Sequence, residues 1–302
     1  MIRIGYYPGC SLPGTAREYD ESVRALAPAL GIELVEVPDW NCCGASAAHN
    51  LNHELSLALP ARILSIAERE GLNEILVPCA ACFNRLARTR ADLLADAALC
   101  KRVTDSTGMP YTGKSIPVNI LDVLSRISPD YISSKVTNPF DFNTASYYGC
   151  LLSRPKDIVQ IERHEDPLVM EGLLESVGAH ALDWAFKVEC CGAGFSVSRT
   201  DIVGKLSAKI VNNAVNCGAD AIIVACPMCH SNLDMRRPAL EKAAKKKFEI
   251  PILYITQAIG LALGLDFKKL GLHRHMVKVN LRPDTLVPLA KEEAVSAMEA
   301  EV

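Results

Sequence analysis

Cysteine is the residue type in this sequence whose number and spacing could do chemistry. The chain has 12 cysteines among 302 residues, and ten of them form a pattern that occurs twice, with one single cysteine, one adjacent pair and one CxxC motif in each copy. The ten are Cys10, Cys42, Cys43, Cys79 and Cys82 in the first copy and Cys150, Cys190, Cys191, Cys226 and Cys229 in the second. Clustered thiolates bind soft metals or take part in redox reactions.

The sequence around these cysteines is duplicated as well. YYPGC at Cys10 is repeated as YYGC at Cys150, NCCGAS as ECCGAG, and ILVPCAACFNRL as IIVACPMCHSNL. The three offsets are 140, 148 and 147 residues, and the copies differ mainly in the 31 or 39 residues that precede the adjacent pair. A near-constant offset indicates two homologous domains. We predict domains at about residues 1–138 and 139–272, followed by a C-terminal extension at 273–302.

Hydrophobic periodicity predicts alternating strands and helices in both copies, several of the helices ending at a glycine. The predicted strands are residues 3–7, 33–37, 74–77, 145–148, 181–184 and 221–225, and the predicted helices are 18–30, 51–69, 168–177 and 201–216. This alternation is typical of parallel sheets, so the predicted fold class is α/β with two duplicated domains.

This fold class tells us where the cysteines lie. Ligand sites in parallel sheets gather at the carboxyl ends of the strands, and Cys10, Cys79, Cys150 and Cys226 each follow a predicted strand. Both CxxC motifs also begin a predicted helix, whose N-terminus favours the thiolate form. We therefore expect the five cysteines of each domain to converge at one edge of its sheet.

Several kinds of site use cysteine, and the number of five cysteines per domain distinguishes between them. Disulfides would leave one cysteine unpaired, and adjacent cysteines bridge with strain. A thioredoxin-like dithiol needs one CxxC motif alone, and a structural zinc ion takes four thiolates and leaves the fifth spare. An iron–sulfur cluster fits better because it can accept more than four sulfur ligands, although the usual cubane spacing CxxCxxC is absent. Zinc in one of the two sites stays as the alternative.

Composition excludes other classes of function. Hydrophobic residues make up 49% and charged residues 22% of a chain with net charge −3, and no basic stripe indicates nucleic-acid binding. No apolar run is long enough to cross a membrane, and the N-terminus does not resemble a secretory signal, so a cytoplasmic protein is expected. Neither GxGxxG nor GxxxxGK[ST] occurs, which assigns flavin or nucleotide binding to a partner.

The doubled C…CCG…CxxC pattern resembles the cysteine-rich CCG domains of the heterodisulfide reductase B family. The resemblance covers nearly the whole chain, including the segment PILYITQAIGLALGLD. It implies that the ten cysteines hold two noncubane [4Fe-4S] clusters, which face each other across a pocket between the domains. A disulfide bound there would receive one electron from each cluster, so the reaction is expected at the cluster irons and no catalytic side chain is assigned.

The family's breadth leaves the substrate open. Methanogen members carry histidines where this chain has Tyr147 and Leu151, which argues against the heterodisulfide of coenzyme M and coenzyme B. The resemblance implies two partners, a ferredoxin-like iron–sulfur protein of the C type and, through it, a flavoprotein of the A type. The alternatives are a relay component of a succinate, lactate, glycolate or sulfur-oxidising complex and a zinc-stabilised scaffold.

Histidines and two further cysteines have competing interpretations. His49 and His53 are one helical turn apart and would line the pocket or lie on a helix surface. His230 follows Cys229 and would tune a cluster or pack internally. Cys100 and Cys217 lie outside the repeat and are predicted to be buried filler.

Charged residues and glycines flank the cysteines. Arg154 and Lys187 would attract an anionic substrate or be ordinary surface charges. Gly44, Gly192 and Gly194 are expected to let the backbone approach a cluster rather than to form a nucleotide-binding loop.

Overall fold

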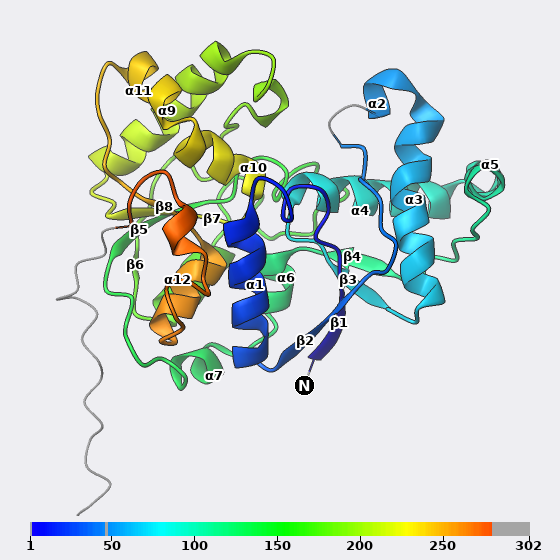
Figure 1. Ribbon diagram of the computed structural model, residues 1–302, viewed down its shortest axis with the longest axis horizontal. Helices are drawn as coiled ribbons and strands as arrows, with labels where there is room; N and C mark the ends of the chain where they lie inside the picture. Colours follow the sequence, from blue (N-terminus) through cyan, green and yellow to red (C-terminus); the bar gives the residue numbers. More distant parts are fainter. Residues whose placement is uncertain (1, 46–47, 280–302) are drawn as a thin grey trace, which may run out of the picture.

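A computed structural model describes residues 2–45 and 48–279 of the chain and contains two parallel four-stranded sheets, one in each half (Figure 1). The first sheet has the strand order β2-β1-β3-β4 and the second β6-β5-β7-β8. The strands are β1 (Ile2–Tyr6), β2 (Ile32–Glu36), β3 (Glu74–Leu76), β4 (Ile116–Val118), β5 (Asn143–Tyr147), β6 (His180–Ala181), β7 (Ala221–Val224) and β8 (Ile252–Tyr254). The identical order confirms a duplicated α/β fold.

Helices alternate with these strands and pack on both sheets (Figure 1). In the first half they are α1 (Arg17–Ala29), α2 (Ala48–Leu51), α3 (His53–Arg69), α4 (Ala80–Ala95), α5 (Ala97–Thr107), α6 (Ile120–Leu124) and α7 (Pro129–Ser133). In the second half they are α8 (Val169–Glu175), α9 (Thr200–Asn216), α10 (Pro227–His230), α11 (Arg237–Ala244) and α12 (Ile255–Ala262). None of the helices in the described ranges is long and apolar enough to span a bilayer.

Local sequence explains most of the element boundaries. Gly31, Gly71, Gly178 and Gly218 all follow helices and have positive φ angles, as the predicted helix ends require. The predicted helix 51–69 is interrupted at Asn52, whose side-chain oxygen accepts a hydrogen bond from the Leu55 N–H at 3.0 Å and caps α3.

Several elements were not predicted from the sequence, among them helix α5 and the two short strands β4 and β8. β4 and β8 have three residues each and lie at the sheet edges, where a periodic pattern has little length in which to develop. The strand predicted at 181–184 is instead the two-residue strand β6. Trp184 leaves the strand and donates its indole N–H to the Ser146 carbonyl at 3.0 Å.

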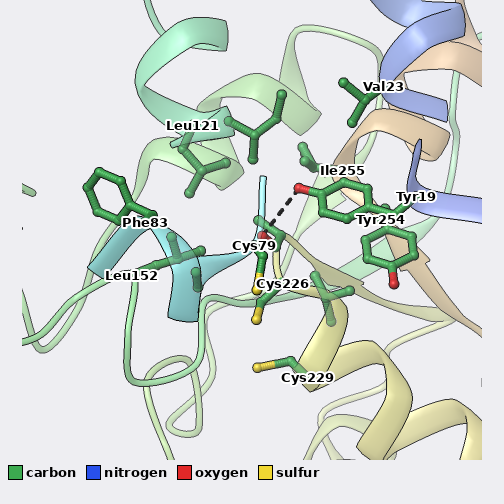
Figure 2. Close-up of a cluster of buried hydrophobic side chains, with 14 of the residues drawn as sticks. Tyr19, Val23, Cys79, Phe83, Leu121, Leu152, Cys226, Cys229, Tyr254 and Ile255 are labelled. Atoms are coloured by element: carbon green, nitrogen blue, oxygen red, sulfur yellow. Dashed lines mark hydrogen bonds between the residues drawn. The ribbon is translucent and has the colours of Figure 1, made fainter. Parts of the chain in front are cut away.

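The two halves meet through helices α1 and α12 and the residues that precede α12. Tyr19 of α1 stacks on Tyr254 with ring centroids 4.0 Å apart, and the Ser22 and Thr256 hydroxyls lie 2.7 Å apart. Tyr19 also donates to the Ala225 carbonyl, at the end of β7 and next to Cys226 (Figure 2). One buried tyrosine of the first half therefore fixes the position of a cysteine loop in the second.

We predict that Tyr19→Ala lowers the free energy of unfolding by about 3–5 kcal/mol, because it empties a fully buried site in this contact. Tyr19→Phe keeps the stacking, loses one hydrogen bond of 3.3 Å and should cost about 1 kcal/mol. Urea denaturation of both variants measures the difference. Equal costs for the two substitutions would contradict a packing role.

Candidate functional site

Each half brings its five cysteines together at the carboxyl ends of its strands. The single cysteine follows the first strand by a few residues, the adjacent pair lies in the loop after the next strand, and the CxxC motif starts a helix. Cys10 and Cys42 have their sulfurs 3.9 Å apart, and the corresponding distance between Cys150 and Cys190 is 4.0 Å. The predicted convergence is therefore found in both halves.

The second sulfur of each adjacent pair faces the CxxC motif. Cys43 lies 3.1 Å from Cys82, and Cys191 lies 3.8 Å from Cys229. The two members of a pair thus point at different partners, as a group larger than one ion would require. In the described part of the chain, no three cysteine sulfurs lie within 4.8 Å of one another.

Backbone hydrogen bonds hold the adjacent pair in the same way in both copies. The Gly44 N–H lies 3.4 Å from the Cys42 sulfur, and the Gly192 N–H lies 3.3 Å from the Cys190 sulfur. Gly44 has a φ of +74° and Gly192 a φ of +81°, a region that other residues adopt at a cost. These N–H groups can stabilise a thiolate or a cluster sulfur.

A buried tyrosine at the end of the first strand of each half, Tyr7 directly after β1 and Tyr147 as the last residue of β5, fixes the residue before each pair. Tyr7 donates its hydroxyl to the Asn41 carbonyl at 2.8 Å, and Tyr147 donates to the Glu189 carbonyl at 2.6 Å. Burial is the largest cause that raises the pKa of both tyrosines, so both hydroxyls stay protonated. Both tyrosines therefore stabilise the loops that carry the adjacent cysteine pairs.

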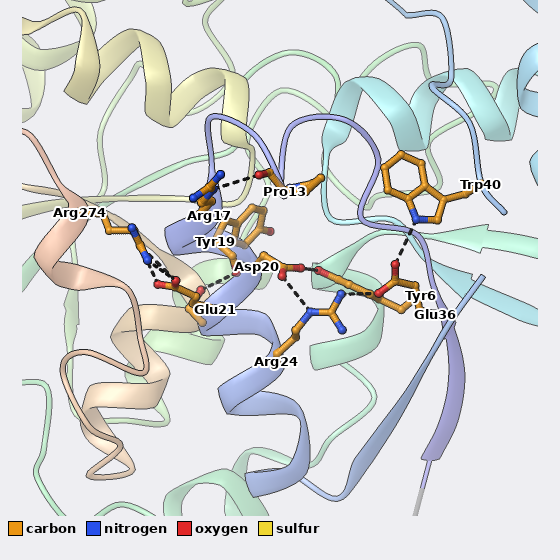
Figure 3. A network of polar contacts seen from close by, with 11 residues as sticks. Tyr6, Pro13, Arg17, Tyr19, Asp20, Glu21, Arg24, Glu36, Trp40 and Arg274 are labelled. Atoms are coloured by element: carbon orange, nitrogen blue, oxygen red, sulfur yellow. Dashed lines mark hydrogen bonds and ion pairs between the residues drawn. The ribbon is translucent and has the colours of Figure 1, made fainter. Parts of the chain in front are cut away.

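In the first half a polar network on α1 adds to this support (Figure 3). Arg24 pairs with Glu36 at 2.6 Å, and Glu36 accepts the indole N–H of Trp40 at 3.1 Å. Trp40 contacts the Tyr7 ring edge-on, with centroids 5.8 Å apart, and precedes the pair by two residues. These contacts position the chain that leads into Cys42.

The two cysteine sets touch at Cys79 and Cys226, the first residues of the two CxxC motifs (Figure 2). Both thiols are buried, and a hydrogen bond between them raises the pKa of Cys79. The hydrogen bonds of Cys226, first with Cys229 and then with Cys79, lower its pKa. The thiolate form is thus favoured at Cys226 and disfavoured at Cys79, although both residues directly precede a helix.

The adjacent pairs contain the other favoured thiolates. Hydrogen bonds from Cys42 and then Cys82 lower the pKa of Cys43 to about 3, and a hydrogen bond from Cys150 lowers the pKa of Cys190 to about 6. Thiolates are the form in which cysteine binds metals. In each half the thiolate form is therefore favoured at one cysteine of the adjacent pair.

The cysteine-rich domain family matches this chain twice, at residues 4–87 and 144–234. This chain belongs to the cysteine-rich domain (CCG) family. It is 32% identical, over 91% of its length and 96% of the relative, to the 8-methylmenaquinol:fumarate reductase membrane anchor subunit of Wolinella succinogenes. It is 29% identical, over 92% and 95%, to the B component of the ferredoxin/F(420)H(2)-dependent CoB-CoM heterodisulfide reductase of Methanosarcina acetivorans.

These matches confirm the resemblance to the heterodisulfide reductase B family that the cysteine pattern indicates. A heterodisulfide reductase B-like protein of Archaeoglobus profundus is 27% identical over 90% of this chain and 94% of the relative. Among solved structures, a hypothetical protein from Helicobacter pylori has a TM-score of 0.75 and 14% identity, and the alignment covers 92% of this chain and 52% of that chain. This structural likeness concerns the fold alone.

Lys187 lies beside the second CCG pair, and neither of the two roles expected for it is found. Its side chain is 3% exposed, and the ammonium pairs with Asp166 at 2.7 Å and Glu171 at 3.2 Å. Glu171 in turn accepts the Tyr148 hydroxyl at 2.5 Å. Lys187 is thus neither a surface charge nor free to attract an anion: it holds together the loops that carry Cys150 and Cys190.

The remaining predicted residues of the CCG domains have other neighbours or lie at the surface. Arg154 pairs with Glu165 at the surface, and His53 is exposed at the start of α3. Cys100 is half-buried and its thiol lies 3.8 Å from the Tyr111 carbonyl. Cys217 is exposed at the end of α9, so its prediction as buried filler is wrong. The side chain of His49 and the extension at 280–302 lie outside the described residues.

The second CCG domain also contains a buried polar group that the sequence did not predict. His230, Asp234 and His275 have ligand atoms within 4.8 Å of one another, and a π-helix at Ser231–Met235 sets their spacing. Asp234 accepts the Met276 and Val277 N–H groups at 2.8 and 3.1 Å. These bonds attach the segment after Arg274 to the helix that follows Cys229.

Hydrogen bonds also connect this group to Gln257 and to the strand β8. The Gln257 amide is oriented by the Tyr254 N–H and the Leu270 carbonyl, both at 2.9 Å, so its N–H₂ faces His275 Nε2. His275 Nδ1 lies 3.3 Å from His230 Nε2, which also lies 3.2 Å from the Ile252 carbonyl. The group thus joins the segment after α12 to the helix that follows Cys229.

Gly9 and Gly149 let the backbone pass close to the CxxC sulfurs. A Cβ at Gly149 would lie 2.8 Å from the Cys229 sulfur, and the residue has a φ of +67°. At Gly9 the corresponding distance to the Cys82 sulfur is 3.2 Å. A side chain at either position would displace a cysteine of its set.

We predict that Gly149→Ala lowers the midpoint of thermal unfolding and changes the reactivity of the Cys229 thiol toward an alkylating reagent. Gly172→Ala is the matched control, because Gly172 lies inside α8 and a Cβ there would meet no atom within 4 Å. The control should be neutral or stabilising by up to about 1 kcal/mol. An equal effect of the two substitutions would disprove the close approach.

Proposed function

We propose that this protein is the heterodisulfide-reductase-B-like catalytic subunit of an electron-transfer complex and binds two noncubane [4Fe-4S] clusters through its ten repeated cysteines. The observation that carries this proposal is the contact between Cys79 and Cys226, which joins two equivalent five-cysteine sets. Two one-electron sites side by side suit the two-electron cleavage, or formation, of a disulfide. The clusters would supply the electrons and the irons that hold the sulfurs.

The sulfur spacing supports a cluster over the zinc alternative. A tetrahedral zinc ion with four thiolates needs sulfurs about 3.8 Å apart in a compact group. In the described residues no three cysteine sulfurs lie within 4.8 Å of one another, although Cys82 contacts both Cys43 and Cys79. Five thiols in each half exceed the four that one zinc ion takes and fit a multi-iron group, whose ligands are farther apart.

The chain's own residues would hold and insulate the clusters. The CxxC sulfurs Cys79, Cys82, Cys226 and Cys229 are buried, which lowers the local dielectric constant, whereas Cys10, Cys42 and Cys190 are exposed. We propose that electrons enter through this exposed side from a ferredoxin-like iron–sulfur protein of the C type, which a flavoprotein of the A type reduces in turn. The exposed free thiols suit a reducing compartment, so we propose the cytoplasm.

The second candidate function is an electron relay without disulfide chemistry of its own. The observation that favours it is the 32% identity to one subunit of a methylmenaquinol:fumarate reductase. Tyr147 adds support, because this buried side chain donates to a backbone carbonyl and offers no group to a substrate. In this case the two clusters would pass electrons between partner proteins.

Metal analysis is the first test of the proposed cofactors. Chain purified without oxygen should contain about eight irons and eight acid-labile sulfides and no stoichiometric zinc. One or two zinc ions without sulfide would overturn the redox function and leave a structural scaffold. If the clusters are present, oxidation of the reduced chain by added disulfides separates the reductase, which reacts, from the relay, which does not.

Serine substitutions test the assignment of cysteines to two sites. We expect Cys43→Ser to halve the iron content by emptying the first site, and Cys191→Ser to do the same at the second, because each residue contacts a cysteine of its own half. Cys100→Ser is the control and should keep the iron content of the unmodified chain. Complete loss of iron in either single variant would contradict two separate sites.

A further inference from the structure

A buried side-chain amide contacts one sulfur of the second cysteine set. Asn232 is fully buried and lies in the π-helical turn Ser231–Met235, which follows the second CxxC motif. Its amide nitrogen lies 3.4 Å from the Cys191 sulfur and 3.1 Å from the Cys191 carbonyl oxygen. Asn232 therefore bonds both the backbone and the side chain of the cysteine whose sulfur lies 3.8 Å from Cys229.

The neighbours of Asn232 fix the direction of its amide. The Cys191 carbonyl can only accept hydrogen bonds, so the amide atom that faces it is the nitrogen. The Ser196 hydroxyl donates to the amide oxygen at 2.8 Å. The Ser196 carbonyl accepts two hydrogen bonds from the Arg236 guanidinium, at 2.5 and 3.0 Å, and Arg236 also donates to the Ser231 hydroxyl at 3.0 Å. These bonds hold the N–H₂ group of Asn232 toward Cys191.

The first copy has different residue types at all four positions of this hydrogen-bonded group. The residues that correspond to Ser196, Ser231, Asn232 and Arg236 are Ala48, Asn84, Arg85 and Thr89. The helix α4 continues through the last three of these positions without a π-helical turn. Among the described residues, this support therefore belongs to the second cysteine set, where it joins the loop after the adjacent pair to the turn after the CxxC motif.

We propose that Asn232 is a positioning residue of the second site, which holds the Cys191 side chain toward Cys229 and donates an N–H···S hydrogen bond to its sulfur. This inference rests on the cluster assignment proposed above. Reduction adds one electron, and hence one negative charge, to a cluster, and a hydrogen bond to a ligand sulfur stabilises that charge. Groups that orient a metal ligand in this way also strengthen the retention of the metal.

The charge of Arg236 is the competing explanation for any electrostatic effect at this site. Among the described residues Arg236 pairs with no carboxylate, and its hydrogen bonds go to Ser196 and Ser231. Two substitutions separate charge from hydrogen bonding. Asn232→Leu removes the donor to the Cys191 sulfur and changes no charge, whereas Arg236→Gln removes the charge and keeps an amide donor for the Ser196 carbonyl. The proposed role requires the larger effect from Asn232→Leu.

An EPR-monitored titration of the iron-loaded full chain with dithionite tests this role. The Cys43→Ser chain, which keeps the second site alone, assigns the second midpoint potential. Asn232→Leu should lower only this midpoint and should release half of the iron to a chelator faster than the unmodified chain does. Ser196→Ala leaves the amide in place but frees its oxygen, so it should give a smaller shift in the same direction. Asn216→Leu, at the exposed end of α9, is the matched control and should leave both midpoints unchanged.

The outcomes that overturn the inference differ from those that overturn the proposed function. A fully iron-loaded Asn232→Leu chain with an unshifted second midpoint contradicts it, and so does a larger shift in Arg236→Gln than in Asn232→Leu. If Asn232→Leu empties the second site, Ser196→Ala decides: a lowered second midpoint supports the inference and an unshifted one contradicts it. A chain that binds neither iron nor sulfide contradicts the proposed function itself, and the metal analysis shows this before any titration.

Discussion

The buried contact between Cys79 and Cys226 is the constraint on which the arrangement of the two halves depends. Each of these residues precedes a helix at the carboxyl end of a central parallel strand, so their contact requires the two sheets to face each other with the same edges. Helices α1 and α12 provide this orientation through the stacked Tyr19 and Tyr254. The interface between the halves and the cysteine site therefore depend on the same residues, because Tyr19 also donates a hydrogen bond to the residue before Cys226.

Duplication explains why so much of the site could be predicted from the sequence. A repeated pattern gives two independent indications of each strand, and a residue after a parallel strand has a known place at the sheet edge. The position of all ten cysteines at that edge follows from these two facts. Lys187 could not be predicted in the same way, because its partners Asp166 and Glu171 are distant in sequence and lie in the stretch that only the second copy has lengthened.

The same limit applies to the network behind Cys229. His230, Asp234 and His275 approach because of a π-helical turn and a segment that returns from the end of α12, and neither has a periodic signal. The short edge strands were not predicted for a related reason, since pairing with β3 and β7 rather than propensity decides that three residues are extended. Contacts between residues that are distant in sequence thus determine the elements and side-chain positions that local sequence patterns do not predict.

The backbone contacts around the cysteines are the same in the two copies, whereas the side chains near them differ. The contacts that position the sulfurs use backbone N–H and carbonyl groups together with one tyrosine, and they are the same at Gly44 and Gly192. Side chains near the sulfurs differ, since Asn232 donates to the Cys191 sulfur and Arg85 takes the corresponding position of the first repeat. A duplicated fold can therefore keep the backbone around two cysteine sets similar while their side-chain surroundings diverge, because the two depend on different atoms.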